Sequence, residues 1–273
     1  MADRPLQRRG HPGELPLRPA RRAHGKPWRA DGEPWRAHSR ARIGRVHAPP
    51  EAPWPVRALG RLNAAYPWSH NHHYHRWIMR QVPRRFGRAL DVGCGSGELV
   101  RLLATRAALA RGIDADPRIV EHAREATEDR ANVEYAVGDA LGDPAAKGPW
   151  DVITSVAVLH HLPLTEALEH LKAQLAPGGT LIVVGCHVPA TPVDHLLGAV
   201  AVPLNPLIGV ARNRGRRPGR APVAMSAPTV PPTMTFHEIA YEARRVLPGA
   251  GPRRRVFWRH TLVWRRPDGG APR

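Results

Sequence analysis

The sequence predicts an α/β protein with a seven-stranded, Rossmann-like, mostly parallel sheet, helices on both faces and an antiparallel strand pair at its C-terminal end. Two observations lead to this fold class. Between residues 88 and 185, short apolar runs alternate with longer segments of helical periodicity, which is the pattern of βαβ units. From residue 235 onward, one more helical segment precedes a β-rich end.

The first strands and helices follow from this alternation. Residues 88–92 form a short apolar strand that stops at glycines, and residues 97–107 have helical spacing. Residues 109–114 are a second strand. Residues 116–129 are a second helix with Pro117 in its first turn, where proline is favourable. The pattern thus predicts two successive strand–helix units.

Three further strands complete the predicted parallel part of the sheet. Residues 132–140 alternate between apolar and polar, and residues 150–162 form an apolar run typical of a strand buried between two helix layers. An amphipathic helix over 163–176 stops at a Pro-Gly-Gly turn and leads into a fifth strand, 180–185. A final helix and strand pair over 235–267 complete the sheet.

The segment 190–234 is predicted to be an insertion ahead of the final helix. Its apolar stretch 195–211 contains Pro203 and Pro206, and we expect these to break it into pieces too short to span a bilayer. A lid over a hydrophobic acceptor is the first interpretation. Contact of 190–220 with a membrane surface is the second, and ordinary core packing is the third.

The N-terminal region divides into two predicted parts. Residues 1–57 contain ten prolines, many arginines and few large aliphatic residues, so we expect this extension to be disordered. A binding arm and a translation start further downstream are the alternatives. Residues 58–87 are predicted to form a helical lid ahead of the sheet, and the core is expected to span 88–189.

The net charge of +18 by itself suggests a nucleic-acid partner, but its distribution along the chain does not. Residues 1–57, 212–220 and 253–273 carry net charges of +8, +5 and +6, so the rest of the chain is close to neutral. A phosphate-binding surface should cluster on folded elements, which disfavours nucleic acid. Two distant cysteines, Cys94 and Cys186, and the lack of a signal-peptide pattern predict a cytoplasmic location.

The turn after the first strand predicts the ligand. Gly93, Gly95 and Gly97 have the spacing G-x-G-x-G, and Glu98 stands where a dinucleotide fingerprint needs glycine. Asp91 precedes the first glycine, and a carboxylate there suits a cationic group better than a pyrophosphate. These two features disfavour an NAD-dependent oxidoreductase, which is the alternative enzyme class.

Two more acids end neighbouring strands. Asp114 ends the second strand, where a carboxylate can accept hydrogen bonds from ribose hydroxyls. Asp139 follows the third strand and could accept from an adenine amino group. Together with Asp91, these acids predict a site for an adenosine ligand with a positively charged amino-acid end.

The chain resembles class I S-adenosylmethionine-dependent methyltransferases, of the small-molecule type related to ubiquinone and menaquinone methyltransferases. The motifs "LDVGCGSGEL", "GIDAD", "GDA", "DVITSVAVLHHL" and "LAPGGTLIVV" occur in the family's order and spacing. The resemblance implies S-adenosylmethionine as cofactor and an unidentified, small, partly apolar methyl acceptor. Asp91 would face the ammonium group, Asp114 the ribose, Asp139 with Ala140 the adenine, and Ser155 with Val156 the methionine end. The implied cofactor-binding set also includes Gly93, Gly95, Gly97 and Ala115.

Transfer of an activated methyl group needs positioning more than acid–base chemistry. His160 and His161 follow the fourth strand and are candidate general bases; the alternative is that one caps a turn and the other faces solvent. "SVAVLHHL" replaces the Asn/Asp-Pro-Pro-aromatic motif that such enzymes use on nucleobase amines. A nucleic-acid-associated methyltransferase that uses the basic tails is therefore only the alternative function.

The segment "SHNHHYHRW" contains four histidines in six positions. Ser69 is a predicted N-cap for a helix that reaches residue 81. In the resembling enzymes a helix at this place closes over the donor, which implies that Tyr74 and His75 contact the cofactor. The alternative is a helix that only packs on the sheet edge through Trp77 and Ile78. A metal site is disfavoured because no cysteine or acid nearby completes a ligand set.

Overall fold

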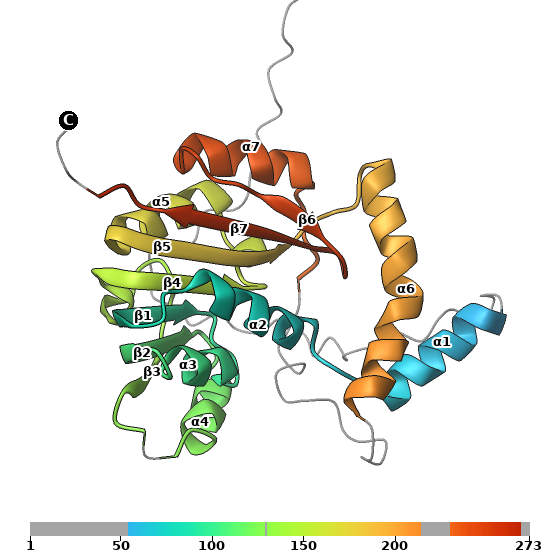
Figure 1. Cartoon of the computed structure of the whole chain (residues 1–273), viewed down its shortest axis with the longest axis horizontal. Coiled ribbons are helices and arrows are strands. Elements are labelled where there is room, and N and C mark those ends of the chain that lie inside the picture. The colour runs from blue at the N-terminus through green and yellow to red at the C-terminus, as the bar shows by residue number, and fades with distance from the viewer. Residues whose placement is uncertain (1–53, 129, 214–229, 269–273) are drawn as a thin grey trace, which may run out of the picture. The chain divides into compact units, whose positions relative to one another are not determined.

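The computed structural model describes residues 54–128, 130–213 and 230–268, and these contain a seven-stranded sheet (Figure 1). The strand order is β3-β2-β1-β4-β5-β7-β6. Strands β1 to β5 are parallel, whereas β7 runs antiparallel to both β5 and β6. This confirms the predicted fold class. The strands are β1 Phe86–Val92, β2 Ala107–Asp114, β3 Val133–Val137, β4 Trp150–Val156, β5 Leu175–Cys186, β6 Arg253–Arg255 and β7 Arg259–Arg265.

Three of the helices begin at residues whose side chains satisfy free N–H groups of the first turn. Asp116 accepts a hydrogen bond from the backbone of Arg118 ahead of α4, and capping boxes begin α6 and α7 at Thr191 and Thr235. The helices are α1 Trp54–Ala65, α2 His70–Gln81, α3 Glu98–Leu103, α4 Pro117–Glu125, α5 Leu164–Gln174, α6 Pro192–Arg212 and α7 Phe236–Val246. Two 3₁₀ turns, η1 Pro144–Ala146 and η2 Leu159–His161, stand before and after β4.

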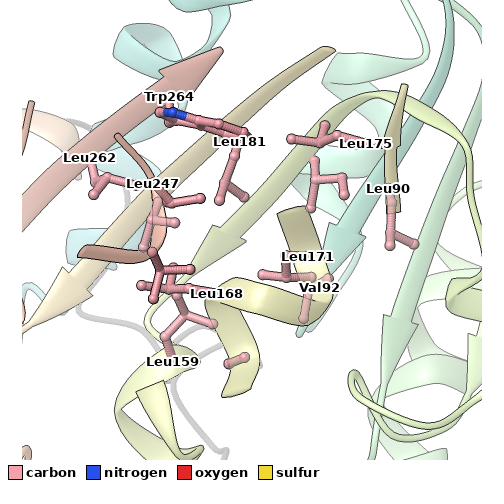
Figure 2. Packing of buried hydrophobic residues seen from close by; sticks show 14 of the residues in the cluster. Leu90, Val92, Leu159, Leu168, Leu171, Leu175, Leu181, Leu247, Leu262 and Trp264 are labelled. Carbon is pink, nitrogen blue, oxygen red and sulfur yellow. The ribbon is translucent and has the colours of Figure 1, made fainter. Parts of the chain in front are cut away.

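One layer of the core lies between the sheet and helices α5 and α7 (Figure 2). Leu168 and Leu171 of α5 pack in one cluster with Leu90, Leu181 and Trp264 from β1, β5 and β7. Side chains alternate between the two faces of a strand, so the neighbours of these strand residues enter the other layer. There, Ile78 of α2 and Val100 of α3 pack with residues of β1, β4 and β5.

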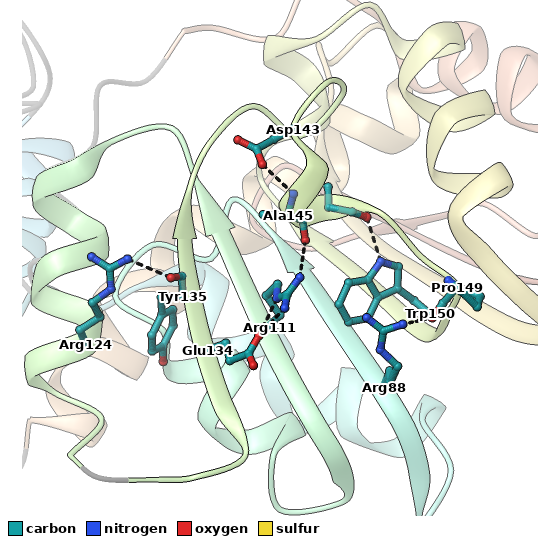
Figure 3. A network of polar contacts seen from close by, with 10 residues as sticks. Arg88, Arg111, Arg124, Glu134, Tyr135, Asp143, Ala145, Pro149 and Trp150 are labelled. Carbon is teal, nitrogen blue, oxygen red and sulfur yellow. Dashed lines mark hydrogen bonds and ion pairs between the residues drawn. The ribbon is translucent and has the colours of Figure 1, made fainter.

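A polar network supports the sheet around the first residue of β4 (Figure 3). The Trp150 ring lies 4.3 Å from the guanidinium carbon of Arg88 and 5.6 Å from that of Arg111. Its indole N–H donates to the carbonyl of Ala146, and Arg111 pairs with Glu134 on β3. These contacts join β1, β2, β3 and β4 without using any residue of the glycine loop.

The expectation that prolines break the insertion is wrong. Helix α6 is continuous over its 21 residues, with Pro203 and Pro206 inside it, and it is long and apolar enough to cross a membrane. The two prolines remove hydrogen bonds to the carbonyls of Ala199 and Val202. Both of those residues are exposed, so water can bond to their carbonyls instead.

Two predicted boundaries also shift. The strand expected over 150–162 ends at Val156, because Ala157 takes a left-handed φ of +58° and the chain then turns through η2. Helix α1 begins at Trp54, inside the extension expected to be disordered. The rest of that extension, 1–53, and residues 214–229 of the insertion lie outside the described residues.

Candidate cofactor and acceptor site

The loop between β1 and α3 has a backbone that needs its glycines. Gly93, Gly95 and Gly97 have φ values of +69°, +50° and +75°, in the left-handed region that favours glycine. A Cβ at Gly93 would lie 2.1 Å from Val158, and one at Gly97 would lie 2.2 Å from the Tyr135 hydroxyl. A Cβ at Gly95 would have no atom within 4 Å. The loop is therefore packed at both ends and open at its centre.

Asp114 ends β2 beside the open part of this loop. Its Oδ2 accepts a hydrogen bond from the backbone N–H of Gly95 at 2.9 Å, and its Oδ1 accepts one from Asp116 at 3.1 Å. Asp116 is itself the N-cap of α4. The structure thus brings Asp114 against the glycine loop and leaves Asp116 to the helix.

Asp91 is buried one residue before the end of β1, with 3% of its surface exposed. Its Oδ1 accepts a hydrogen bond from the Thr154 hydroxyl on β4 at 2.6 Å. Burial raises the pKa of Asp91 to about 7, with a smaller upward contribution from Asp114, while the Thr154 bond lowers it. The carboxyl group is therefore poised to ionise near neutral pH. Thr154 was missed by the sequence reasoning, because a threonine in an apolar strand is typical of ordinary packing.

The third predicted acid is solvent-exposed. Asp139 follows β3, and its Oδ1 accepts a hydrogen bond from the backbone of Leu141 at 3.0 Å. The backbone N–H of Gly138 donates to the carbonyl of Asp114 at the end of β2. Asp139 is the next residue after Gly138, so it lies close to the end of β2. Ala115 is exposed and Ala140 half-buried. The three acids therefore lie at or next to the ends of adjacent strands, in the order β3, β2, β1.

The end of β4 combines burial with an unusual backbone. Ser155 is fully buried, and its hydroxyl has no hydrogen-bond partner in the described part of the chain. Val156 is half-buried, and the left-handed Ala157 follows it. Strained backbone at a strand end that meets a ligand loop is common at functional sites. These residues lie at the same edge of the sheet as the glycine loop, because β1 and β4 are parallel neighbours.

His160 and His161 both lie in η2, with ring centroids 4.0 Å apart. Burial, assisted by the charges of His161 and Arg259, lowers the pKa of His160 to about 4. Burial also lowers the pKa of His161. The Nδ1 atom of His160 is buried and has no partner among the described residues. Both rings are therefore neutral at pH 7 and can accept hydrogen bonds.

Helix α2 begins and ends where the sequence predicts, although the Ser69 side chain makes no capping bond. Tyr74 and His75 are 4% and 8% exposed. The Tyr74 hydroxyl donates to the carbonyl of Val256 at 2.8 Å, and burial raises the Tyr74 pKa to about 12. Burial, with a smaller effect of His72 and Arg212, lowers the pKa of His75 to about 3. Tyr74 thus packs in the core, and its contact with a cofactor stays a prediction.

The other histidines of this segment join α2 to its neighbours. His72 Nε2 lies 3.1 Å from the Glu98 carboxylate at the start of α3. His70 is hydrogen-bonded to Asn205 of α6 at 2.8 Å and stacks on Phe257 between β6 and β7. Within the described residues, no group of three His, Cys, Asp or Glu side chains is arranged to hold a metal ion.

Sequence reasoning also missed a cavity beside η2. A space of about 50 Å³ is lined by His160, Gly185, Cys186, Met234 and His260, among others. His260 comes from β7, paired with Gly185 of β5. Its sequence neighbourhood is rich in arginine and aromatic residues, so no local signal assigns it to the same site as His160. Only the strand pairing brings the two histidines together.

Comparison with known proteins agrees with this geometry. Residues 89–179 match the family model described as a methyltransferase domain. An uncharacterized methyltransferase of Mycobacterium tuberculosis (strain ATCC 25618 / H37Rv) is 33% identical over 205 residues, which cover 74% of this chain and 98% of that protein. A ubiquinone biosynthesis O-methyltransferase of Xylella fastidiosa (strain 9a5c) is 36% identical over 115 residues, 39% of this chain and 45% of that protein.

The fold has solved counterparts as well. A crystal structure of a Pyrococcus horikoshii OT3 protein superposes with a TM-score of 0.51 at 17% identity, covering 71% of this chain and 88% of that one. The order of the motifs and the mycobacterial methyltransferase, which is 33% identical and covered over 98% of its length, exclude the oxidoreductase alternative. The chain belongs to the class I S-adenosylmethionine-dependent methyltransferase family.

Proposed function

We propose that this protein binds S-adenosylmethionine at the loop after β1 and transfers its methyl group to a small, partly apolar acceptor. The observation that carries the proposal is the open backbone at Gly95, held beside the Asp114 carboxylate by a 2.9 Å hydrogen bond. A ligand can approach this backbone closely from a side where no atom of the described residues competes for the space.

The residues around the loop fit the parts of this cofactor. Asp91, buried and poised to ionise, would face the ammonium group, and Asp114 would accept the ribose hydroxyls. Asp139 and Ala140 would contact the adenine. The bound cofactor supplies a methyl group already activated on a sulfonium, so the protein needs only to orient it and exclude water. Ser155 and Val156 stand where the methionine end would lie.

Titration of S-adenosylhomocysteine into the purified full chain tests the proposal. We expect saturable heat and thermal stabilisation, because a ligand that binds only the folded state raises its stability. NAD serves as the matched control, since it shares the adenosine part but lacks the amino-acid end. Absence of both heat and stabilisation with S-adenosylhomocysteine, or equal binding of NAD, would contradict the proposal.

A second proposal concerns where the protein works. We propose a cytoplasmic protein that touches a membrane surface through α6. Val193, Leu196, Val200 and Leu207 are exposed on this helix, at spacings that place them along one stripe. Large exposed apolar patches mark interaction sites. The Asp194 carboxylate, paired with Arg254 at 2.8 Å, fixes the helix to the core, which favours surface contact over spanning.

Co-sedimentation with vesicles of phosphatidylserine and phosphatidylcholine tests the membrane proposal. We expect the full chain to sediment with these vesicles, and the double variant Leu196→Glu, Leu207→Glu to lose most of this binding. Tyr241→Glu, at an exposed aromatic residue of α7, is the matched control and should bind as the wild type does. Equal binding by the α6 variant would refute contact through this helix.

The basic segments give little support to a nucleic-acid partner. Within 253–268, several arginines are bonded to other groups of the protein. Arg254 pairs with Asp194, and Arg265 and Arg266 donate to backbone carbonyls of the β5 region. Most other basic residues of the tails lie outside the described residues, so this alternative function rests on sequence composition alone.

A further inference from the structure

Buried polar atoms without partners are concentrated at one place in this molecule. Among the described residues, five buried side-chain atoms have no hydrogen-bond partner: Ser155 Oγ, His160 Nδ1, His187 Nδ1, Arg259 Nε and His260 Nδ1. Folded proteins satisfy about nine in ten or more of their buried polar groups. All five exceptions lie at or just beyond the ends of β4 and β5 or at the start of β7, which is paired with β5.

Three of the five gather on one face of the sheet. Gly185 of β5 is paired with His260 of β7, and a Cβ at Gly185 would meet the His260 ring at 2.4 Å. His187 lies two residues further along the chain, and its ring centroid is 5.7 Å from that of His260. Ser155 is paired with Val183, two residues before Gly185. Side chains two residues apart in a strand share a face.

Arg259 differs from these three. It alternates with His260 on β7, so its side chain lies on the opposite face, where it donates to Asn71 of α2 at 3.3 Å. Its charge nevertheless contributes to the lowered pKa values of His160, His187 and His260. It therefore acts as a fixed positive charge close to the group of histidines.

Two of these histidines line the cavity beside η2. His160 and His260 face a space whose other walls include Leu162, Leu164 and Met234, and its lining contains no acidic residue among those the structure describes. Burial, with the charges of His187, Arg259 and His160, lowers the pKa of His260 to about 3. The cavity is thus largely apolar, uncharged at pH 7 and lined by two histidines that each keep an unpartnered buried nitrogen. It lies at the carboxyl ends of β4 and β5, where the methyl group would be presented.

We propose that this cavity, with a volume of about 50 Å³, receives the hydroxyl-bearing end of the methyl acceptor, and that the acceptor is an uncharged, largely apolar molecule whose hydroxyl group hydrogen-bonds to His160 and His260. A hydroxyl both donates and accepts, so it can satisfy a neutral imidazole nitrogen in either tautomer. An ammonium group would find no acid in the described lining and would be repelled by the charge of Arg259 nearby, whereas a carboxylate would meet only neutral rings. The inference rests on the proposed function, because it assigns the second substrate of the same reaction.

Ligand-observed NMR on the full chain saturated with S-adenosylhomocysteine tests the inference. Phenol and toluene are the probes, since they differ only in a hydroxyl and a methyl group; benzoate and benzylammonium are the charged probes. We expect phenol to bind about tenfold more tightly than toluene, and both charged probes to bind more weakly than phenol. Equal binding of phenol and toluene, or tighter binding of either charged probe, would overturn the inference.

Variants separate acceptor binding from a structural role. His260→Leu and His160→Leu each remove one unpartnered nitrogen, and His122→Leu on α4 is the control. We expect phenol affinity to fall by about tenfold in the first two while toluene affinity and melting temperature do not fall. Unchanged phenol affinity in both variants would overturn the inference. A large drop in melting temperature in both variants would also overturn the inference. It would show that the two nitrogens stabilise the fold through ordered water instead of binding an acceptor.

The S-adenosylhomocysteine titration distinguishes the two failures. If the wild type does not bind it, the proposed function fails. If it binds but phenol is not recognised through its hydroxyl, only the assignment of the acceptor cavity fails.

Discussion

Gly95 donates its backbone N–H to Asp114 Oδ2 over 2.9 Å, and this bond joins the loop after β1 to the end of β2. One carboxylate therefore shapes the glycine loop, and in the proposed function it also accepts hydrogen bonds from the ribose. Because each carboxylate oxygen can accept more than one hydrogen bond, the two roles are compatible. The candidate cofactor site is thus built by a contact between neighbouring strands.

Replacing Asp114 with alanine should weaken cofactor binding. Loss of charge-assisted hydrogen bonds to ribose should cost roughly 1.5–3 kcal/mol of binding free energy, measured by titration with S-adenosylhomocysteine. Asp116→Ala is the control: it removes the α4 cap, so it should lower the free energy of unfolding by about 1 kcal/mol and leave affinity unchanged. Equal effects of both variants on affinity would show that the wrong acid has been assigned.

An alanine at Gly95 should reduce affinity through the space it fills. Gly249 is a matched glycine, since it also has a positive φ, +81°, and a Cβ placed on it would have no atom within 4 Å. Both substitutions should strain the backbone, at about 1–2 kcal/mol of stability each. Only Gly95→Ala should also weaken binding of S-adenosylhomocysteine. Normal binding by that variant would show that the loop does not cradle the ligand.

Ionisation of Asp91 should make binding depend on pH. The pKa of Asp91 is raised to about 7, so its carboxyl group is largely protonated at pH 5.5 and increasingly charged by pH 7.5. If it faces a cationic amino group, affinity for S-adenosylhomocysteine should rise over this interval, and binding at pH 6 should release a proton. Calorimetry in buffers of different ionisation enthalpy measures that proton.

Asp91→Asn should remove this pH dependence, whereas Glu125→Gln, on the exposed end of α4, should keep it. A wild-type affinity that is constant between pH 5.5 and 7.5, with no proton release, would contradict the ammonium contact. The same Asp91 variant should not lower stability at pH 7.5, because it replaces a carboxyl group whose charged form is disfavoured by burial.

The buried histidines should make the protein less stable in mild acid. His75 and His260 have pKa values of about 3, and His160 of about 4, all lowered chiefly by burial. Below pH 6.5 the unfolded chain binds protons that the folded chain does not, so the free energy of unfolding falls as pH drops toward 4. Urea unfolding should show a smaller slope with pH for His260→Leu than for the wild type. An identical slope would mean that His260 is protonated in the folded state.

The geometry of the candidate cofactor site was predictable, because its signals are local. A strand that stops at Gly93, and acids placed at the ends of successive strands, can be read from a single stretch of chain. Parallel strands then bring those ends to one edge. The structure accordingly places Asp91 and Asp114 together, although the Thr154 bond to Asp91 depends on the pairing of β1 with β4.

The cavity proposed for the acceptor was not predictable, because it depends on distant pairing. His260 reaches His160 only through the antiparallel register of β7 on β5. The course of α6 was predicted wrongly for a related reason: tertiary contacts override the local cost of Pro203 and Pro206. Trp68, far away in the sequence, donates its indole N–H to the carbonyl of Asn205 within this helix at 2.9 Å.

A crystal structure of the full chain with S-adenosylhomocysteine tests the central claim most directly. We expect the ligand to lie across the carboxyl ends of β1, β2 and β4. Its ribose hydroxyls should donate hydrogen bonds to Asp114, and it should contact the backbone of Gly95. Its sulfur should face the cavity of His160 and His260. A ligand bound elsewhere, or one whose ribose makes no contact with Asp114, would contradict the proposed site.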